Sequence, residues 1–157
     1  MIYKIFATDS DAATSIVRLM LGIIFFAHGA QKLLGWFGGP GYSATMGFFR
    51  DLLHIPAPLA FLAIMAEFLG GIGLILGFLT RIAALGIGVN MIVAIVTVHG
   101  AYGLFMNWSG RQKGEGFEFH LLVLAIVVFL IFRGGGALSV DRAITFSSHL
   151  KEVVRIQ

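Results

Sequence analysis

The chain has 157 residues, of which 58% are hydrophobic and only 12% are charged. A soluble domain contains about 25% charged residues, so the composition excludes an ordinary soluble protein and indicates an integral membrane protein in contact with the lipid bilayer. The formal net charge is +3 and there is no cysteine. Lys and Arg form no cluster that would predict nucleic-acid binding, and disulfides and thiolate ligands are excluded.

Four apolar segments follow one another along the chain. Because the hydrocarbon core is about 30 Å thick and a helix rises about 1.5 Å per residue, a span needs about 20 residues. Helix N-caps stand at positions 8–11, and Gly35 is placed to end the first helix. The last apolar run, Leu121–Phe132, is too short alone, so its helix is expected to begin at Glu115. The predicted spans are about 12–34, 57–79, 82–99 and 115–133.

A shorter helix is predicted between the first two spans. Residues Tyr42–His54 place apolar side chains at helical spacing, with Arg50 and Asp51 opposite. Such a helix lies at the membrane interface or dips back into the bundle. The expected fold is therefore an all-α membrane protein, a four-transmembrane-helix bundle with a short interfacial helix between helices 1 and 2, in one domain over residues 1–157. The tail Val140–Ile156 is expected to lie on the membrane surface.

An even number of spans places both termini on one side of the membrane. That side carries the excess of Lys and Arg, so the positive-inside rule predicts a multi-pass protein with both termini in the cytoplasm. Arg18 and Arg81 lie near these ends and are predicted to be snorkelling anchors.

Glycines recur along one stripe of the second span, at Gly70, Gly73 and Gly77. Small residues let helix backbones approach closely in lipid, so this stripe predicts helix packing. Packing within the chain and a homo-oligomer of the chain both remain open.

Ionisable residues interrupt the apolar segments. Because successive helices run in opposite directions, these residues converge on one half of the bilayer. Glu67 lies near mid-depth of the second span, where a charge costs about 2.5–3.5 kcal/mol. It therefore needs a proton, water, or a cationic partner such as Lys32, Arg18 or a histidine. Four helices deliver to the same half of the bilayer the residues His28, Gln31, Lys32, Glu67, His99, Glu118 and His120.

Several stretches of the chain resemble a known family. They are HGAQKLLGWFGGPG (His28–Gly41), AEFLGGIGLILGFLTRIAAL (Ala66–Leu85), and the GEGFEFHLL that opens the fourth span, with the closing GGGALSVDR. In order and spacing, from about Ala12 to Arg142, they resemble the DoxX family of small four-helix membrane proteins. The matching motif positions are His28, Gln31, Lys32, Gly38, Gly39, Glu67, Gly70, Gly71, Thr80, Arg81 and Glu118.

The resemblance implies redox-linked work in a bacterial or archaeal plasma membrane. The family is associated with a terminal quinol oxidase and with thiosulfate:quinone oxidoreductase. Some relatives are linked to quinone or catechol stress, and others to a membrane complex with superoxide dismutase and a sulfurtransferase. A soluble or membrane redox partner is therefore expected.

The first hypothesis is a quinone-interacting membrane subunit of an oxidoreductase. A quinone needs an apolar slot for its ring, hydrogen-bond donors for its oxygens and a proton route. The expected catalytic residues are Glu67, His28 and Glu118, and the expected quinone-binding residues are His28, Gln31, Lys32, His99 and His120. Whether the chain is catalytic alone is left open, because without cysteine the electrons come from a partner or from the substrate.

Four alternatives remain at this stage. The same residues could form the ligand path of a small-molecule transporter or binding protein. His28, His99 and His120 with Glu67 and Glu118 could hold haem or a metal, although no ligand-spaced pair such as HxxxH is present, and no metal is expected. The protein could be a membrane anchor for soluble redox partners. The polar residues could also have only a structural role, as salt bridges that hold the helices together.

Overall fold

The computed structural model describes residues 3–8 and 10–147, and in these residues every regular element is a helix. A further helix begins at residue 140 and is described as far as residue 147. The all-α prediction is confirmed, whereas the predicted tail beyond residue 147 lies outside the described residues. The elements in order are α1 (Tyr3–Phe6), α2 (Ala12–Leu34), the 3₁₀-helix η1 (Trp36–Gly38), α3 (Gly41–Gly47), the π-helix η2 (Phe48–Leu52), α4 (Ala57–Leu76), α5 (Thr80–Thr97), the 3₁₀-helix η3 (His99–Tyr102) and α6 (Glu118–Arg133).

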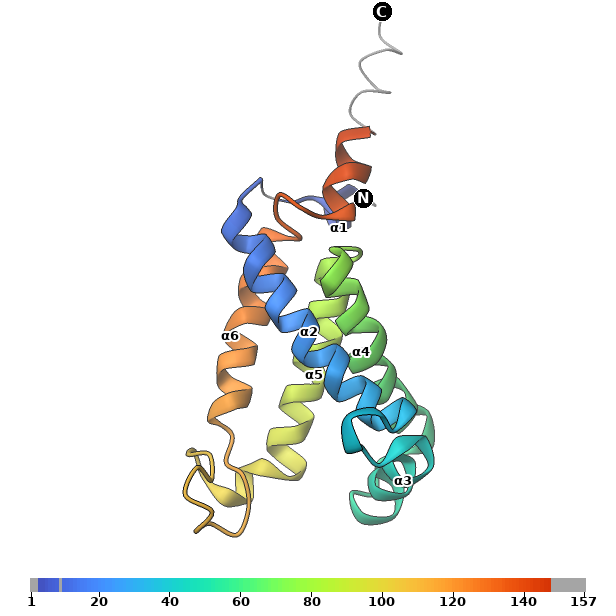
Figure 1. Cartoon of the computed structure of the whole chain (residues 1–157), viewed down its shortest axis with the longest axis vertical. Coiled ribbons are helices and arrows are strands. Elements are labelled where there is room, and N and C mark those ends of the chain that lie inside the picture. Colours follow the sequence, from blue (N-terminus) through green and yellow to red (C-terminus); the bar gives the residue numbers. More distant parts are fainter. Residues whose placement is uncertain (1–2, 9, 148–157) are drawn as a thin grey trace, which may run out of the picture.

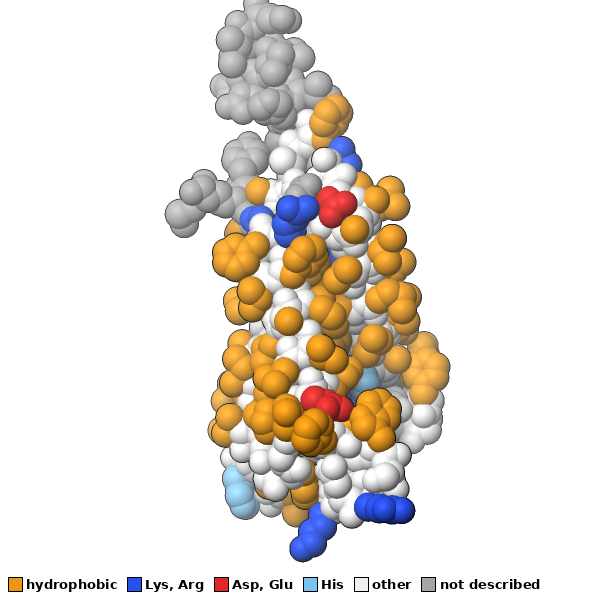
Figure 2. Space-filling model, turned by 90° about the vertical axis from the view of Figure 1, so that its left-hand side faces the viewer, with side chains coloured by type: hydrophobic (Ala, Val, Ile, Leu, Met, Phe, Trp, Pro, Cys, Tyr) orange, Lys and Arg blue, Asp and Glu red, His pale blue; other side chains and the backbone are white. Residues whose placement is uncertain are grey.

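Four helices pack side by side, α2 against α4, α4 against α5, α5 against α6, and α6 back against α2 (Figure 1). Hydrophobic side chains cover most of the face in Figure 2, and Lys and Arg side chains lie towards its two ends. Within the described residues, α2, α4 and α5 are long and apolar enough to cross a membrane. Helix α6 has 16 residues, about 24 Å, which is less than the hydrocarbon thickness.

The helix ends differ from the predicted spans by a few residues, for reasons visible in the backbone. Helix α4 ends at Leu76 because Gly77 turns left-handed, with φ +66°. Helix α5 begins at Thr80, since the Asp141 carboxylate accepts hydrogen bonds from the backbone N–H groups of Leu79 and Thr80, at 2.8 and 2.9 Å. At its other end α5 stops at Thr97, because Val98 leaves the helical conformation with φ −130°, and His99 lies in η3. The predicted N-cap and C-cap of α2 are confirmed as Asp11 and Gly35.

The α2–α4 contact uses other glycines than the predicted stripe. A Cβ added at Gly71 would lie 2.4 Å from the backbone nitrogen of Phe26, and one at Gly29 would lie 2.4 Å from that of Phe68. Gly22 makes a similar approach to α4. The stripe residues Gly70 and Gly73 instead face α5 and the turn after α4, and Gly77 lies outside the helix. Gly70 and Gly73 of the predicted stripe therefore lie at the α4–α5 contact, and other glycines form the α2–α4 contact.

The prediction that Arg18 is a snorkelling anchor was wrong. Its side chain is buried, with 2% of the residue exposed. The guanidinium donates to the carbonyl oxygens of Leu74 and Ile75 at the end of α4, and to those of Gly135 and Leu138 in the segment after α6. Helix ends leave backbone carbonyl groups that need further donors, so Arg18 closes the end of α4 and fixes the chain that follows α6.

Two neighbouring glycines give a matched test of the α2–α4 contact. Gly71→Ala should lower the free energy of unfolding by about 1–3 kcal/mol, because the new methyl group meets helix backbone that cannot yield. Gly70→Ala should be nearly neutral, since its methyl would lie 3.5 Å from a terminal carbon of Ile87. Thermal unfolding in a mild detergent measures both, and equal midpoints for the two variants would contradict this description of the contact.

Candidate functional site

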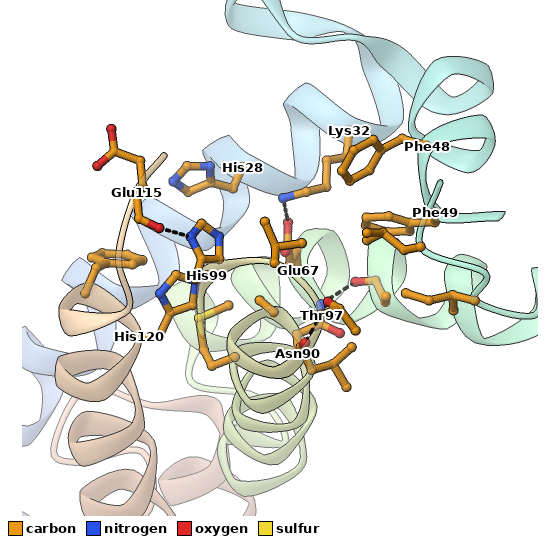
Figure 3. Close-up of a pocket in the computed structure, with 18 of the residues that line it drawn as sticks. His28, Lys32, Phe48, Phe49, Glu67, Asn90, Thr97, His99, Glu115 and His120 are labelled. Atoms are coloured by element: carbon orange, nitrogen blue, oxygen red, sulfur yellow. Dashed lines mark hydrogen bonds and ion pairs between the residues drawn. The ribbon is translucent and has the colours of Figure 1, made fainter. Parts of the chain in front are cut away.

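A cavity of about 570 Å³ lies inside the end of the bundle remote from the start of α2 (Figure 3). Its walls come from the second half of α2, the first half of α4, the second half of α5 and the start of α6, with η2 on the remaining side. The lining residues are Phe25, His28, Lys32, Phe48, Phe49, Leu53, Ile55, Ala63, Glu67, Asn90, Met91, Val93, Ala94, Thr97, Val98, His99, Met106, Glu115, Phe119 and His120.

An ion pair joins α2 to α4 in the wall of the cavity. The Lys32 ammonium contacts Glu67 Oε2, and Glu67 is buried, with 7% of the residue exposed (Figure 3). Lys32 is the cationic partner that the sequence required for Glu67, whereas Arg18 lies at the opposite end of α2. Pairing offsets much of the cost of the buried carboxylate, and the ammonium keeps further N–H groups with which it can donate to a ligand.

Two histidines from different elements lie against each other in the same cavity. The rings of His99 in η3 and His120 in α6 have centroids 4.2 Å apart, at an interplanar angle of 43°. His99 Nδ1 is 2.8 Å from the backbone oxygen of Glu115 (Figure 3). His120 is buried and its Nδ1 has no hydrogen-bond partner among the described residues. The pair therefore retains polar atoms that the described protein does not satisfy.

Helix α5 contributes two polar residues that were not predicted as site residues. Asn90 and Thr97 are seven positions apart, two helical turns, so both lie on the face that lines the cavity. The Asn90 amide donates an interhelical hydrogen bond of 2.8 Å to the Ala63 oxygen of α4. The Thr97 hydroxyl donates to its own helix, to Val93 O. Their spacing of seven residues in the sequence could have predicted that both lie on the same face of α5.

The segment predicted as a short interfacial helix forms α3 and η2 and covers one side of the cavity. Phe48, Phe49 and Leu53 are three of its lining residues. The π-helical geometry of η2 is uncommon and occurs frequently at functional sites. The segment ends at His54, whose φ of +55° turns the chain towards α4. An aromatic wall thus faces the ion pair.

Two predicted site residues lie outside the lining. The Gln31 amide donates to the Phe37 oxygen at 3.4 Å, in the turn after α2. Glu118 Oε1 accepts a hydrogen bond of 3.0 Å from Trp108 Nε1, which links the loop before α6 to that helix. The structure therefore brings together His28, Lys32, Glu67, His99 and His120. In the described part of the chain, no group of three His, Cys, Asp or Glu side chains is arranged to hold a metal.

This arrangement suits a flat, largely apolar ligand with oxygen atoms at its edge. Ligand pockets of about 300–1,000 Å³ are typically lined by apolar and aromatic side chains with a few oriented polar groups. Here Phe25, Phe49 and Phe119 contribute apolar surface, while the ion pair and the histidines supply hydrogen-bonding groups.

Comparisons with known proteins cover most of the chain. The family model described as DoxX matches residues 13–100. The chain is 29% identical over 132 residues to "Inner membrane protein YqjF" of Escherichia coli K12, covering 84% of this chain and 92% of the relative. It is 30% identical over 131 residues to "Putative oxidoreductase CatD" of Bacillus subtilis 168, covering 83% and 86%. No solved structure matches the chain.

A double-mutant cycle tests the ion pair. Lys32→Met leaves Glu67 buried without its cation, so it should destabilise the protein more than the double variant Lys32→Met/Glu67→Gln, in which no unpaired charge remains. The coupling free energy should be about 1–3 kcal/mol, measured by unfolding in detergent. Strictly additive effects would show that the two side chains do not interact.

Proposed function

This chain belongs to the DoxX family, and from that membership and its cavity we propose that it is a redox-linked membrane subunit that binds a quinone. The observation that carries the proposal is one cavity that combines aromatic walls, the ion pair of Lys32 with the buried Glu67, and three histidines. The name of the Bacillus relative, "Putative oxidoreductase CatD", supports redox work in the same family.

The ring of the quinone would lie among the apolar residues. Phe48 and Phe49 of η2 would cover it on one side and Phe25 and Met91 on the other helices would contact it. Aromatic side chains favour stacked or edge-on contacts with such a ring. The Lys32 ammonium would donate a hydrogen bond to one quinone oxygen, with Glu67 holding the ammonium in place.

Protons and electrons would enter by different routes. Reduction of a quinone to its quinol takes two electrons and two protons. Histidines exchange protons near neutral pH, so His28 and His99 are the candidate proton carriers. The chain has no cysteine for thiol redox chemistry, so the electrons would come from a partner protein.

The bilayer would surround all four long helices, with α6 as the fourth span. Residues 114–117, which precede α6, would then lie in the headgroup region and make up for its short length. The excess of Lys and Arg at the end that contains the start of α2 and the segment after α6 would place that end in the cytoplasm of a bacterial or archaeal cell. The cavity would then occupy the outer half of the membrane.

Titration of the purified protein with duroquinone tests the proposal. The wild type should bind it saturably, and Lys32→Met/Glu67→Gln should bind it about 10–100-fold more weakly, because a charged hydrogen-bond donor contributes about 1.5–3 kcal/mol. Lys113→Met changes an exposed lysine outside the cavity and is the control with unchanged affinity. No saturable binding to the wild type, or equal affinities for all three proteins, would contradict a quinone site here.

A further inference from the structure

We infer that His99 and His120 form a hydroxyl-binding pair, so that this cavity prefers the reduced, hydroxyl-bearing form of its ligand to the carbonyl form. The inference rests on the proposed function, because it concerns the same cavity. It goes further by assigning a hydrogen-bond polarity to each ring and by naming the redox state of the ligand that fits.

The hydrogen bond of His99 fixes its tautomer. A backbone carbonyl oxygen only accepts, so His99 Nδ1, at 2.8 Å from Glu115 O, must carry the proton. The acceptor is itself held in place, since Glu115 Oε2 accepts a 2.6 Å hydrogen bond from Asn107 N in the loop. In the neutral ring the other nitrogen, Nε2, is then unprotonated. His99 therefore meets a ligand as a hydrogen-bond acceptor.

The burial of His120 fixes the opposite polarity. Its Nδ1 is buried and has no partner among the described residues. A proton on this atom would leave an orphaned N–H donor, the kind of group that folded proteins rarely bury. The doubly protonated ring would bury a positive charge as well. The proton of the neutral ring therefore lies on Nε2, and His120 meets a ligand as a hydrogen-bond donor.

Together the two rings present one acceptor and one donor, 4.2 Å apart between centroids. A hydroxyl group is their complement, because it donates to His99 Nε2 and accepts from His120 Nε2. A carbonyl oxygen can accept from His120 but leaves His99 Nε2 without a donor. Sites built to bond a hydroxyl discriminate strongly against ligands that lack it, because buried polar groups are then left unpaired.

One end of the ligand would therefore contact the Lys32 ammonium, and the other end would contact the His99–His120 pair. The Lys32 ammonium donates to an oxygen in either redox state, because both carbonyl and hydroxyl oxygens accept. Only the histidine pair distinguishes the two states. This separates general affinity, which depends on Lys32 and the aromatic walls, from the choice of redox state.

The test uses two air-stable probes that differ at one hydroxyl, 4-methoxyphenol and 1,4-dimethoxybenzene. Calorimetric titration of the purified full-length protein should give about tenfold tighter binding of 4-methoxyphenol. Anaerobic titrations should likewise give tighter binding of durohydroquinone than of duroquinone. These comparisons are made on the wild type, so they need no variant to fold.

Two matched variants assign the preference to His99. In His99→Asn the side-chain amide can still donate to Glu115 O but the Nε2 acceptor is gone, so the affinity ratio of the two probes should fall to about one. His54→Asn is the control with an unchanged ratio, because His54 does not line the cavity and asparagine tolerates its positive φ.

The outcomes separate the inference from the proposed function. A wild-type ratio near one, or a full ratio retained in His99→Asn, overturns the hydroxyl-binding pair while saturable duroquinone binding leaves the quinone site standing. Absence of duroquinone binding contradicts the quinone site itself, whatever the ratio of the two phenolic probes.

Discussion

Close backbone contact between α2 and α4 governs the geometry of the buried charges. Gly29 has no side chain where α2 meets the backbone of Glu67 and Phe68, and the Lys32 side chain begins three residues further along the same helix. A larger residue at Gly29 would push the helices apart beside Glu67. Without its cation, that carboxylate would face the full cost of burial in a low-dielectric environment. Packing and site chemistry are therefore coupled at one place.

The two ends of the bundle treat buried polar groups differently. At one end the Arg18 guanidinium donates to backbone oxygens of α4 and of the segment after α6, and the Asp141 carboxylate accepts from backbone N–H groups at the start of α5. These bonds hold helix ends together and leave little capacity for a ligand. At the other end, Lys32, His99 and His120 line the cavity, and the buried His120 Nδ1 has no hydrogen-bond partner among the described residues. Polar groups bonded to backbone favour rigidity, and polar groups that line a cavity favour binding.

The sequence predicted the helices and most of the ionisable residues in the cavity wall, because these follow from apolar length and alternating helix direction. His28, Lys32, Glu67, His99 and His120 lie at the same end of four successive helices for that reason alone. What failed depended on rotation about a helix axis. Arg18 faces inward rather than towards the headgroups, and Gly71, which was not predicted as a packing residue, faces α2. In near-uniformly apolar helices, hydrophobic periodicity carries little information on which face is buried.

The loops account for the remaining differences. Glu118 accepts a hydrogen bond from Trp108, and Gln31 donates one to the Phe37 oxygen. The spacing of these residues in the sequence does not predict either contact. The role of Asp141 as the N-terminal cap of α5 joins residues more than sixty positions apart, so it could not be read from the residues next to that helix.

Mass spectrometry of the organic extract of the purified protein tests the account most directly. The protein would be prepared in mild detergent from a quinone-producing host, alongside Ala94→Phe, which places a bulky ring in the cavity wall. The account predicts near-stoichiometric quinone with the wild type and little with the folded Ala94→Phe variant. Wild-type protein free of quinone, or equal amounts of quinone in both preparations, would contradict it.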